Sequence, residues 1–259
     1  MAAQGKFVWY DLMTTEKTAA LAFYHAVIGW GTASGGVADR DYTILSAGMT
    51  PVGGAMDLPQ MARDAGARPS WIGYIGVDDV DAAVARLEAA GGGVHRAAED
   101  IPDVGRFAVV HDPQGATFTL FTPSGRQQAL DAAAGTPGHV GWHELHAASG
   151  DDAFAFYAEQ FGWTKGEPHA MGPMGIYQLF ATGGEAVGGM MTKMPNFPVP
   201  VWIFYFNVED TAAAVIRIKD GGGQVLNGPI QVPGGSWIAQ ALDPQGAMFA
   251  VVGPGNAEG

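Results

Sequence analysis

Stretches of alternating apolar and polar residues follow one another along the chain, separated by segments with helical spacing. Residues 6–13 alternate, with Trp9 and Asp11 on the same face, which is typical of a strand. Residues 16–28 are rich in alanine, carry an apolar stripe and end at Gly29, which predicts a helix closed by a glycine C-cap. Two or three short strands are expected to follow this helix.

The same order of strand, helix and strands then begins again. In the second module, a strand over 71–77 leads into a helix over 78–90, where Asp78 or Asp79 is expected to be the N-cap. Short strands complete this module, and the whole arrangement returns after residue 138. The pattern therefore predicts four β-α-β-β-β modules, over residues 6–58, 70–122, 139–192 and 201–252.

The second half of the chain repeats the first. The Trp-Tyr-Asp-Leu segment at 9–12 returns as Trp-His-Glu-Leu at 142–145, an offset of 133 residues. The Asp-Pro-Gln-Gly turn at 112–115 returns at 243–246, an offset of 131 residues. A unit of this length has the size of a domain rather than of a solenoid repeat. Two equivalent cavities, or a single shared cleft, are therefore expected.

The repeat, and the segment rich in glycine, proline and alanine between its copies, set the expected domain boundaries. Because strands outnumber helices and each module contains one helix, we expect an α+β fold, in which the two modules of each half form a curved sheet with helices on its outer face. The concave face would then hold a small molecule. The expected organisation is a first domain at 1–123, a linker at 124–138, a second domain at 139–253 and a tail at 254–259.

Composition narrows the classes of function. The formal charge of −13 argues against binding to nucleic acid and to an anionic membrane surface, since both attract clustered lysine and arginine. The chain has no cysteine, which excludes disulfides, thiolate metal sites and a cysteine nucleophile. It has no apolar signal region and no apolar run long enough to span a bilayer, so we expect a cytoplasmic protein with a small-molecule partner.

Several of these segments together resemble the vicinal oxygen chelate superfamily, which includes glyoxalase I, extradiol dioxygenases and the bleomycin- and fosfomycin-resistance proteins. The resemblance rests on the Phe-Tyr pair at 23–24, the Gly-Trp pair at 29–30, the stretch at 77–83 and the Asp-Pro turn at 112–115. Each of these segments has a counterpart in the second half. The resemblance covers nearly the whole chain and implies a tandem, two-domain member of the superfamily.

The resemblance also indicates where a metal would bind. Metalloenzymes of this superfamily place a histidine on the first strand of a module and a glutamate on the last. At the matching positions this chain has Trp9, Trp142, Thr119 and Ala250. Indole and methyl groups cannot ligate a hard divalent cation. We therefore expect no metal and no other cofactor, with a bound divalent metal as the alternative.

Asp11 and Glu144 occupy equivalent places, two residues after the repeated tryptophan. Each is a candidate acid–base or hydrogen-bonding group at the floor of a cavity. The alternative is a strand-end carboxylate that caps a turn or meets solvent. His146 follows Glu144 by two residues, so both side chains are expected on one strand face with Cβ atoms roughly 7 Å apart, and His143 is expected to point away. His146 is the third catalytic candidate; the alternatives are a new metal site in the second half only, or a histidine satisfied within the pocket.

Aromatic, methionine and threonine side chains near the expected concave faces are candidates for ligand contacts. Aromatic rings can stack on a flat apolar ligand, and methionine adapts to its shape. The alternative is that these side chains fill the inherited cavity as ordinary core, and the same alternative applies to Trp71 and Trp202. The ligand-binding candidates are Trp9, Met13, Met56, Tyr74, Thr119, Trp142, Met191 and Tyr205.

These features predict a metal-independent protein, similar to glyoxalase and bleomycin-resistance proteins, that sequesters or transforms a small, partly apolar organic compound. One alternative is a metal-dependent lyase or extradiol-type dioxygenase. Another is a non-catalytic structural or regulatory module whose cavities are filled by its own side chains. Because the halves can pair within one chain, a monomer or a homodimer is expected.

Overall fold

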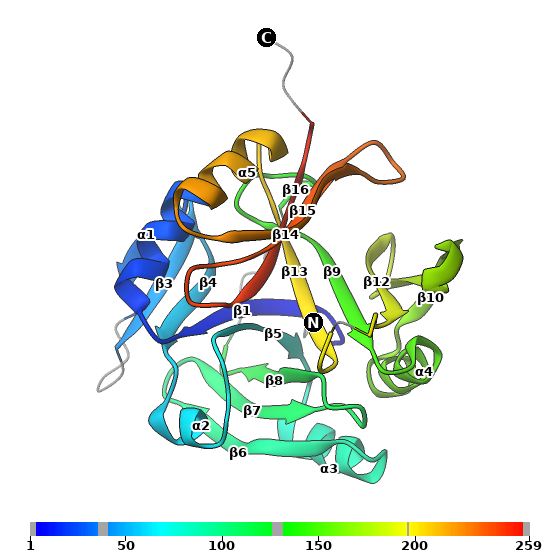
Figure 1. The fold of residues 1–259 in the computed structure, drawn as a ribbon. Coiled ribbons are helices and arrows are strands. Elements are labelled where there is room, and N and C mark those ends of the chain that lie inside the picture. Colours follow the sequence, from blue (N-terminus) through cyan, green and yellow to red (C-terminus); the bar gives the residue numbers. More distant parts are fainter. Residues whose placement is uncertain (1–3, 36–40, 126–131, 196, 256–259) are drawn as a thin grey trace. The chain divides into compact units, whose positions relative to one another are not determined.

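The computed structural model describes residues 4–35, 41–125, 132–195 and 197–255 (Figure 1). The expected linker and tail therefore lie partly outside the described residues. Within the described ranges the chain forms many strands and fewer helices, as expected for an α+β fold.

The elements of the two halves correspond closely. The described residues of the first half form β1 (Phe7–Thr14), α1 (Lys17–Ile28), β2 (Gly31–Ser34), β3 (Tyr42–Ala47), β4 (Thr50–Asp57), α2 (Gln60–Asp64), β5 (Ser70–Gly76), α3 (Val80–Ala89), β6 (Gly93–Ile101), β7 (Gly105–His111) and β8 (Thr117–Pro123). Those of the second half form β9 (Val140–Ala147), α4 (Gly150–Phe161), β10 (Thr164–Ala170), a short 3₁₀ helix (Gly172–Met174), β11 (Ile176–Ala181), β12 (Ala186–Thr192), β13 (Val201–Asn207), α5 (Thr211–Asp220), β14 (Gln224–Gln231), β15 (Trp237–Leu242) and β16 (Met248–Gly253).

Hydrogen bonds join the strands of each half into one eight-stranded sheet. The strand order is β2-β3-β4-β1-β5-β8-β7-β6 in the first half and β10-β11-β12-β9-β13-β16-β15-β14 in the second. Counted from the start of each half, the two orders are the same. The repeat in the sequence is therefore also a repeat of strand topology, which confirms the tandem arrangement of paired modules.

The helix ends follow the local sequence signals. Gly29 at the C-cap of α1 has a φ of 90°, a left-handed conformation that glycine adopts without a steric penalty. Asp79 accepts a hydrogen bond from the backbone N–H of Ala82 and so caps α3. The sequence pattern did not predict α2, a short helix with no buried side chain. None of the helices in the described ranges is long and apolar enough to cross a membrane.

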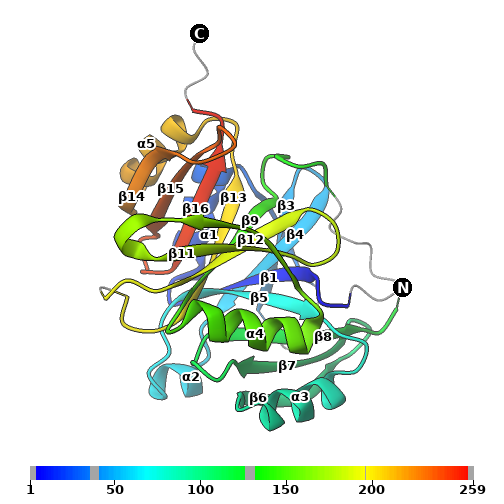
Figure 2. The ribbon, with the colours of Figure 1, turned by 90° about the vertical axis from the view of Figure 1, so that its right-hand side faces the viewer.

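The chain folds into two compact units, and each unit combines a module from one half with a module from the other. Unit 1 consists of Met1–Trp9, Ile72–Asp131 and His143–Trp202, and unit 2 of Tyr10–Trp71, Ala132–Trp142 and Ile203–Gly259. In unit 1, α3 packs on β6, β7 and β8 and contacts α4, which packs on β11 and β12 (Figure 2). In unit 2, α1 packs on β4 and contacts α5, which packs on β14, β15 and β16 (Figure 1).

A buried hydrogen-bond network links the Phe-Tyr and Asp-Pro motifs inside unit 1. The Tyr157 hydroxyl donates to Asp112 Oδ2 (3.2 Å) and accepts from Trp202 Nε1 (3.0 Å). Asp112 Oδ1 accepts the backbone N–H groups of Gln114 and Ala116, which fixes the turn. Burial raises the pKa of the Asp112 carboxyl and the pKa of the Tyr157 hydroxyl.

Unit 2 contains the same network. Tyr24 donates to Asp243 Oδ2 (3.2 Å) and accepts from Trp71 Nε1 (2.8 Å). Trp71 is 5% exposed and Trp202 is 3% exposed, which supports the core interpretation of these two tryptophans. The motifs that carry the family resemblance thus have a structural role, since each network joins residues from both halves of the chain.

Candidate functional site

Asp11 lies in the middle of β1 and is 3% exposed, so it is not a carboxylate that meets solvent. Its Oδ1 accepts a hydrogen bond of 2.6 Å from the hydroxyl of Tyr42 on β3. Strand β4 lies between β1 and β3, and its Gly54 is in register with Asp11. The Tyr42 side chain therefore reaches across a neighbouring strand to bind the carboxylate.

The second half repeats this pair and adds a histidine. Glu144 on β9 is 7% exposed, and its Oε2 accepts a hydrogen bond of 2.9 Å from the hydroxyl of Tyr177 on β11. Its Oε1 lies 2.6 Å from His146 Nε2, which confirms that both side chains share one strand face. The imidazole stacks on Phe197, with ring centroids 4.4 Å apart and an interplanar angle of 16°.

Glycine in the intervening strand makes room for each tyrosine. A Cβ at Gly54 would overlap Tyr42, and a Cβ at Gly189 on β12 would overlap Tyr177. Both glycines belong to the repeated Val-Gly-Gly segments. Because these positions carry no side chain, the tyrosine ring lies across the strand and its hydroxyl reaches the carboxylate.

The hydrogen bonds of the second-half cluster determine the tautomer of its histidine. Glu144 Oε1 faces His146 Nε2, and in the neutral tautomer of His146 that donates from Nε2 the lone pair is on Nδ1. This Nδ1 is buried and has no hydrogen-bond partner in the described part of the chain. Thr119 Oγ1, at another of the expected site positions, has the same property. Buried polar atoms seldom lack a partner, so both are candidates for contact with a ligand or an ordered water.

The two halves differ beside their carboxylates. Met13 occupies on β1 the place that His146 occupies on β9, and it is in register with Met56 on β4. His146 is in register with Met191, which is 6% exposed. The first half therefore combines its carboxylate with thioethers, whereas the second combines its carboxylate with an imidazole and a thioether.

Two further expected residues lie on β5 and β13. Tyr74 on β5 is half-buried and is in register with Thr119 on β8, which is 1% exposed. Tyr205 on β13 is 1% exposed, and its hydroxyl accepts a hydrogen bond of 2.7 Å from Gln240 Nε2. Tyr74 is thus the more accessible of the two tyrosines.

The residues at the superfamily's metal positions do not form a ligand set. Trp9 and Trp142 are half-buried indoles, Ala250 is a buried methyl group, and Thr119 offers a single hydroxyl. In the described residues, no three histidine, cysteine, aspartate or glutamate side chains gather closely enough to hold a metal ion. A divalent cation needs several nitrogen or oxygen donors, which these positions do not supply.

His143 has surroundings quite unlike those of its neighbour Glu144. Its ring stacks on Phe7 at 4.2 Å, and its Nδ1 lies 2.8 Å from the carbonyl oxygen of Val187. Burial lowers the pKa of His143 to about 4, so the imidazole is neutral at pH 7. Its counterpart in the first half is Tyr10, which is also buried and has a raised pKa. His143 therefore belongs to the packed core of unit 1.

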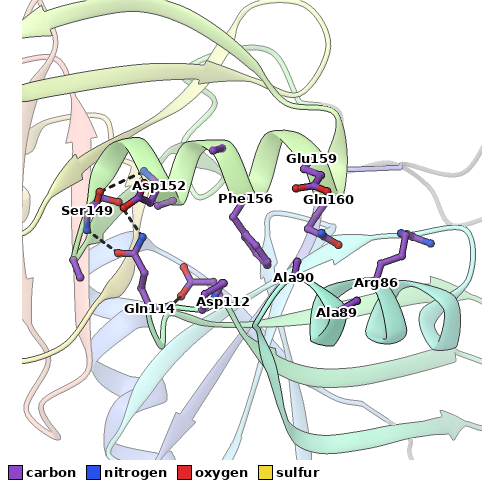
Figure 3. Close-up of a pocket in the computed structure, with 14 residues that line it drawn as sticks. Arg86, Ala89, Ala90, Asp112, Gln114, Ser149, Asp152, Phe156, Glu159 and Gln160 are labelled. Atoms are coloured by element: carbon purple, nitrogen blue, oxygen red, sulfur yellow. Dashed lines mark hydrogen bonds between the residues drawn. The ribbon is translucent and has the colours of Figure 1, made fainter.

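A groove of about 900 Å³ lies elsewhere in unit 1, between α3, α4 and the Asp-Pro turn that precedes β8 (Figure 3). It is lined by none of the expected catalytic or ligand-binding residues. The cavity expected at the sheet face is therefore not this groove.

The sequence pattern did not identify Tyr42, Tyr177 or Phe197. For the tyrosines a signal existed, since they are 135 residues apart, the same offset that relates the Val-Gly-Gly segments. Phe197 gave no such signal, because it lies in a loop that differs in sequence from its counterpart in the first half.

Several curated proteins align with almost the whole chain. The putative glyoxylase CFP32 of Mycobacterium tuberculosis is 34% identical, covering 97% of this chain and 95% of its own length. The anthracycline biosynthesis protein DnrV of Streptomyces peucetius is 32% identical, with 96% and 94% covered. DauV of Streptomyces sp. strain C5, also named an anthracycline biosynthesis protein, is 31% identical, with 96% and 94% covered.

Solved structures share the fold at lower identity. The Mn(II)-bound glyoxalase from Novosphingobium aromaticivorans has a TM-score of 0.67 at 16% identity, covering 98% of this chain and 83% of that one. The 2,3-dioxygenase LapB from Pseudomonas sp. KL28 has a TM-score of 0.62 at 14% identity, covering 96% and 91%. In sequence, the model of the Glyoxalase/Bleomycin resistance protein/Dioxygenase superfamily matches residues 6–120 and 136–251, once in each half. The chain belongs to this superfamily.

Proposed function

We propose that this protein binds a small, partly apolar organic compound at the sheet faces that carry Asp11 and Glu144, without a metal ion held by the protein. The observation that carries the proposal is the buried carboxylate–tyrosine pair found in both halves, Asp11 with Tyr42 and Glu144 with Tyr177. A few fixed polar groups among aromatic and sulfur-containing side chains are the usual make-up of a small-molecule site.

The residues beside the carboxylates suit an aromatic compound. The half-buried indoles of Trp9 and Trp142 offer stacking surfaces, and the partly exposed Met13 and Met56 offer an adaptable apolar wall. Two relatives are named anthracycline biosynthesis proteins and another a putative glyoxylase, which favours an aromatic or carbonyl-containing ligand.

Within this function, we assign proton transfer to the second half and hydrogen bonding alone to Asp11. A proton that moves from a ligand hydroxyl to His146 Nδ1 leaves an imidazolium beside the Glu144 carboxylate, which stabilises the new charge. Met13, the counterpart of His146, has no group that can accept a proton at neutral pH.

A thermal-shift screen of EDTA-dialysed protein tests the binding proposal. The compounds are planar phenols, quinones and an anthracycline, each with and without added Mn²⁺. A compound at 100 times its Kd raises the free energy of unfolding by about 2.7 kcal/mol. We expect at least one compound to stabilise the protein equally in both conditions, and Tyr42→Phe or Tyr177→Phe to reduce the shift. Stabilisation only with Mn²⁺ would indicate a metal-dependent enzyme, and no stabilisation at all would indicate self-filled cavities; both results contradict the proposal.

Absorption spectroscopy of a bound phenol tests the assignment of proton transfer. A phenol and its phenolate have different absorption spectra, so the spectrum of the bound hit compound shows whether its hydroxyl proton has moved to the protein. We expect the phenolate spectrum with the parent protein and with the control Met13→Leu, and the phenol spectrum with His146→Asn. The same phenolate spectrum with the parent and with His146→Asn would show that another group takes the proton.

A further inference from the structure

The groove of unit 1 lies beside α3 and α4, whose counterparts in unit 2 are α5 and α1. In unit 2, Phe23 on α1 lies so close to the end of α5 that a Cβ at Gly221 would be 2.9 Å from the ring. Arg217 on α5 donates from Nε (3.3 Å) and Nη2 (3.1 Å) to the carbonyl oxygen of Val27. Helices α1 and α5 thus meet through an aromatic ring and a bound arginine.

Two residues at the corresponding positions of unit 1 are different. Ala90 stands where unit 2 has Gly221, and both Ala90 and Phe156, the counterpart of Phe23, line the groove. Gln160 stands where unit 2 has a valine. Unit 1 therefore has a larger residue and a polar residue where unit 2 has a small one and an apolar one.

Polar side chains without a protein partner among the described residues line this groove. Gln160 is 9% exposed, and its side chain makes no hydrogen bond in the described part of the chain. The side chains of Arg86, Asp152 and Glu159 also line the groove and have no ion pair or hydrogen bond among the described residues. The Gln160 amide atoms are in contact with the groove rather than sealed from solvent, so they are available to a ligand there.

The charged groups lie at two ends of the groove. Figure 3 shows Arg86, Glu159 and Gln160 near one end and Asp152 near the other. Asp152 and Glu159 are seven residues apart on α4, which corresponds to roughly 10 Å along the helix axis. Phe156 and several alanines form the wall between the two ends.

We propose that this groove binds a free α-amino acid, preferably one with a basic side chain. At one end, the Arg86 guanidinium and the Gln160 amide N–H suit the carboxylate of the ligand, and Glu159 suits its α-ammonium group. At the other end, Asp152 suits a cationic side-chain terminus. The apolar wall suits the methylene groups between. None of these residues belongs to the clusters around Asp11 and Glu144, so this site does not depend on what binds there.

Isothermal titration calorimetry of the full chain with L-lysine tests the proposal. The comparison ligands are cadaverine, which lacks the carboxylate, and L-norleucine, which lacks the terminal amine. We expect L-lysine to bind at least about tenfold more tightly than either, the effect of losing one charge-assisted hydrogen bond. No binding of L-lysine, or equal binding of all three, would overturn the proposal.

Substitutions in the groove give a second test. Arg86→Gln and Glu159→Gln should each weaken L-lysine binding about tenfold. Arg63→Gln, which removes an exposed arginine outside the groove, is the matched control and should leave it unchanged. Unchanged binding in Arg86→Gln, whose side chain is exposed and not needed for folding, would contradict the assignment.

The combined substitution Glu159→Ala and Gln160→Val gives α4 the residues that unit 2 has at the same positions. We expect it to abolish L-lysine binding and to keep the free energy of unfolding, because the same helix positions hold alanine and valine in unit 2. Binding as strong as in the parent, with a native circular dichroism spectrum, would refute the proposal. If this variant does not fold, Arg86→Gln alone decides.

Discussion

The role of each buried carboxylate is determined by its hydrogen-bond donors. Asp112 and Asp243 each accept two backbone N–H groups and one tyrosine hydroxyl, and they hold a turn and a core together. Asp11 and Glu144 accept from a tyrosine two strands away. Residues of the same chemical type therefore divide into structural and candidate functional groups.

The Asp–Tyr–Trp networks predict a loss of stability in Tyr24→Phe and Tyr157→Phe. Each substitution leaves a buried carboxylate oxygen and an indole N–H without their shared partner, which should lower the free energy of unfolding by about 1–3 kcal/mol. Urea denaturation measures the change. Tyr42→Phe, at a half-buried tyrosine, is the control and should lose less. Equal losses in all three variants would contradict this view of the networks.

Because His143 is buried, it should make the free energy of unfolding depend on pH. Its pKa falls from 6.5 in the unfolded chain to about 4 in the folded protein, so between these values only the unfolded chain binds the proton. Its contribution is full above pH 6.5 and is lost on acidification toward pH 4, by about 3 kcal/mol in total. The raised pKa of Asp112 and that of Asp243 affect stability in the opposite direction. The folded protein holds those protons more tightly than the unfolded chain, so these two groups stabilise the fold as the pH falls.

His143→Phe isolates this contribution. The difference in unfolding free energy between the parent and the variant, measured in urea at several pH values from 7 to 4, cancels the contribution of the aspartates. We expect the parent to lose more stability than the variant as the pH falls. Parallel pH profiles would show that His143 is not buried in its neutral form.

At the scale of single residues, the sequence predicted part of the candidate site. Asp11 and Glu144 could be found because both copies are acidic at the same place, and the spacing of two residues put His146 on the face of Glu144. Tyr42 and Tyr177 could not be found from alternation alone, because each reaches its carboxylate across a glycine in a neighbouring strand. Strand pairing, rather than strand periodicity, creates that contact.

Secondary-structure elements begin and end at local sequence signals, and helix α1 lacks one of them, a side-chain N-cap. Helix α4 begins after Ser149, whose Oγ accepts the Asp152 N–H, whereas α1 begins after Glu16 without a side-chain cap. Glu16→Ser, which copies Ser149, should raise the free energy of unfolding by about 0.5–1 kcal/mol, and Ser149→Ala should lower it by a similar amount. Chemical denaturation measures both, and a decrease in Glu16→Ser would argue against a vacant cap at α1.

The elements that the pattern of apolar and polar residues predicted are those with one buried face. Strand β1 and helices α1 and α3 bury apolar side chains and were expected within a few residues of their bounds. Strand β2 exposes all of its residues and α2 buries none, so neither carries a pattern. Such elements form because neighbouring structure pairs with them or because local turns favour them.

At the scale of the whole molecule, each compact unit contains modules from both halves. The sequence could not specify this arrangement, because the motifs are the same in both copies. From the motifs alone, Asp112 could bind either Tyr24 or Tyr157; in the structure it binds Tyr157. The choice between equivalent partners is made by tertiary packing.

Because each unit contains modules from both halves, we expect that residues 1–131 alone do not form a folded monomer. Without the second half, Tyr24 loses Asp243, and Asp112 loses Tyr157. We expect the fragment either to be unfolded or to dimerise, with one copy supplying the partners for the other. Circular dichroism with light scattering after size exclusion measures this. A monomer with native strand content would contradict the shared construction of the units.

The central claim is that the cation-holding positions of the superfamily no longer carry ligands in this chain, so that small molecules are bound by the carboxylate–tyrosine pairs themselves. Elemental analysis of protein purified without chelator tests it most directly, with Glu144→Gln as the companion variant. We predict manganese, iron, nickel and zinc far below one ion per chain in both proteins. A stoichiometric ion in the parent that Glu144→Gln removes would contradict the claim.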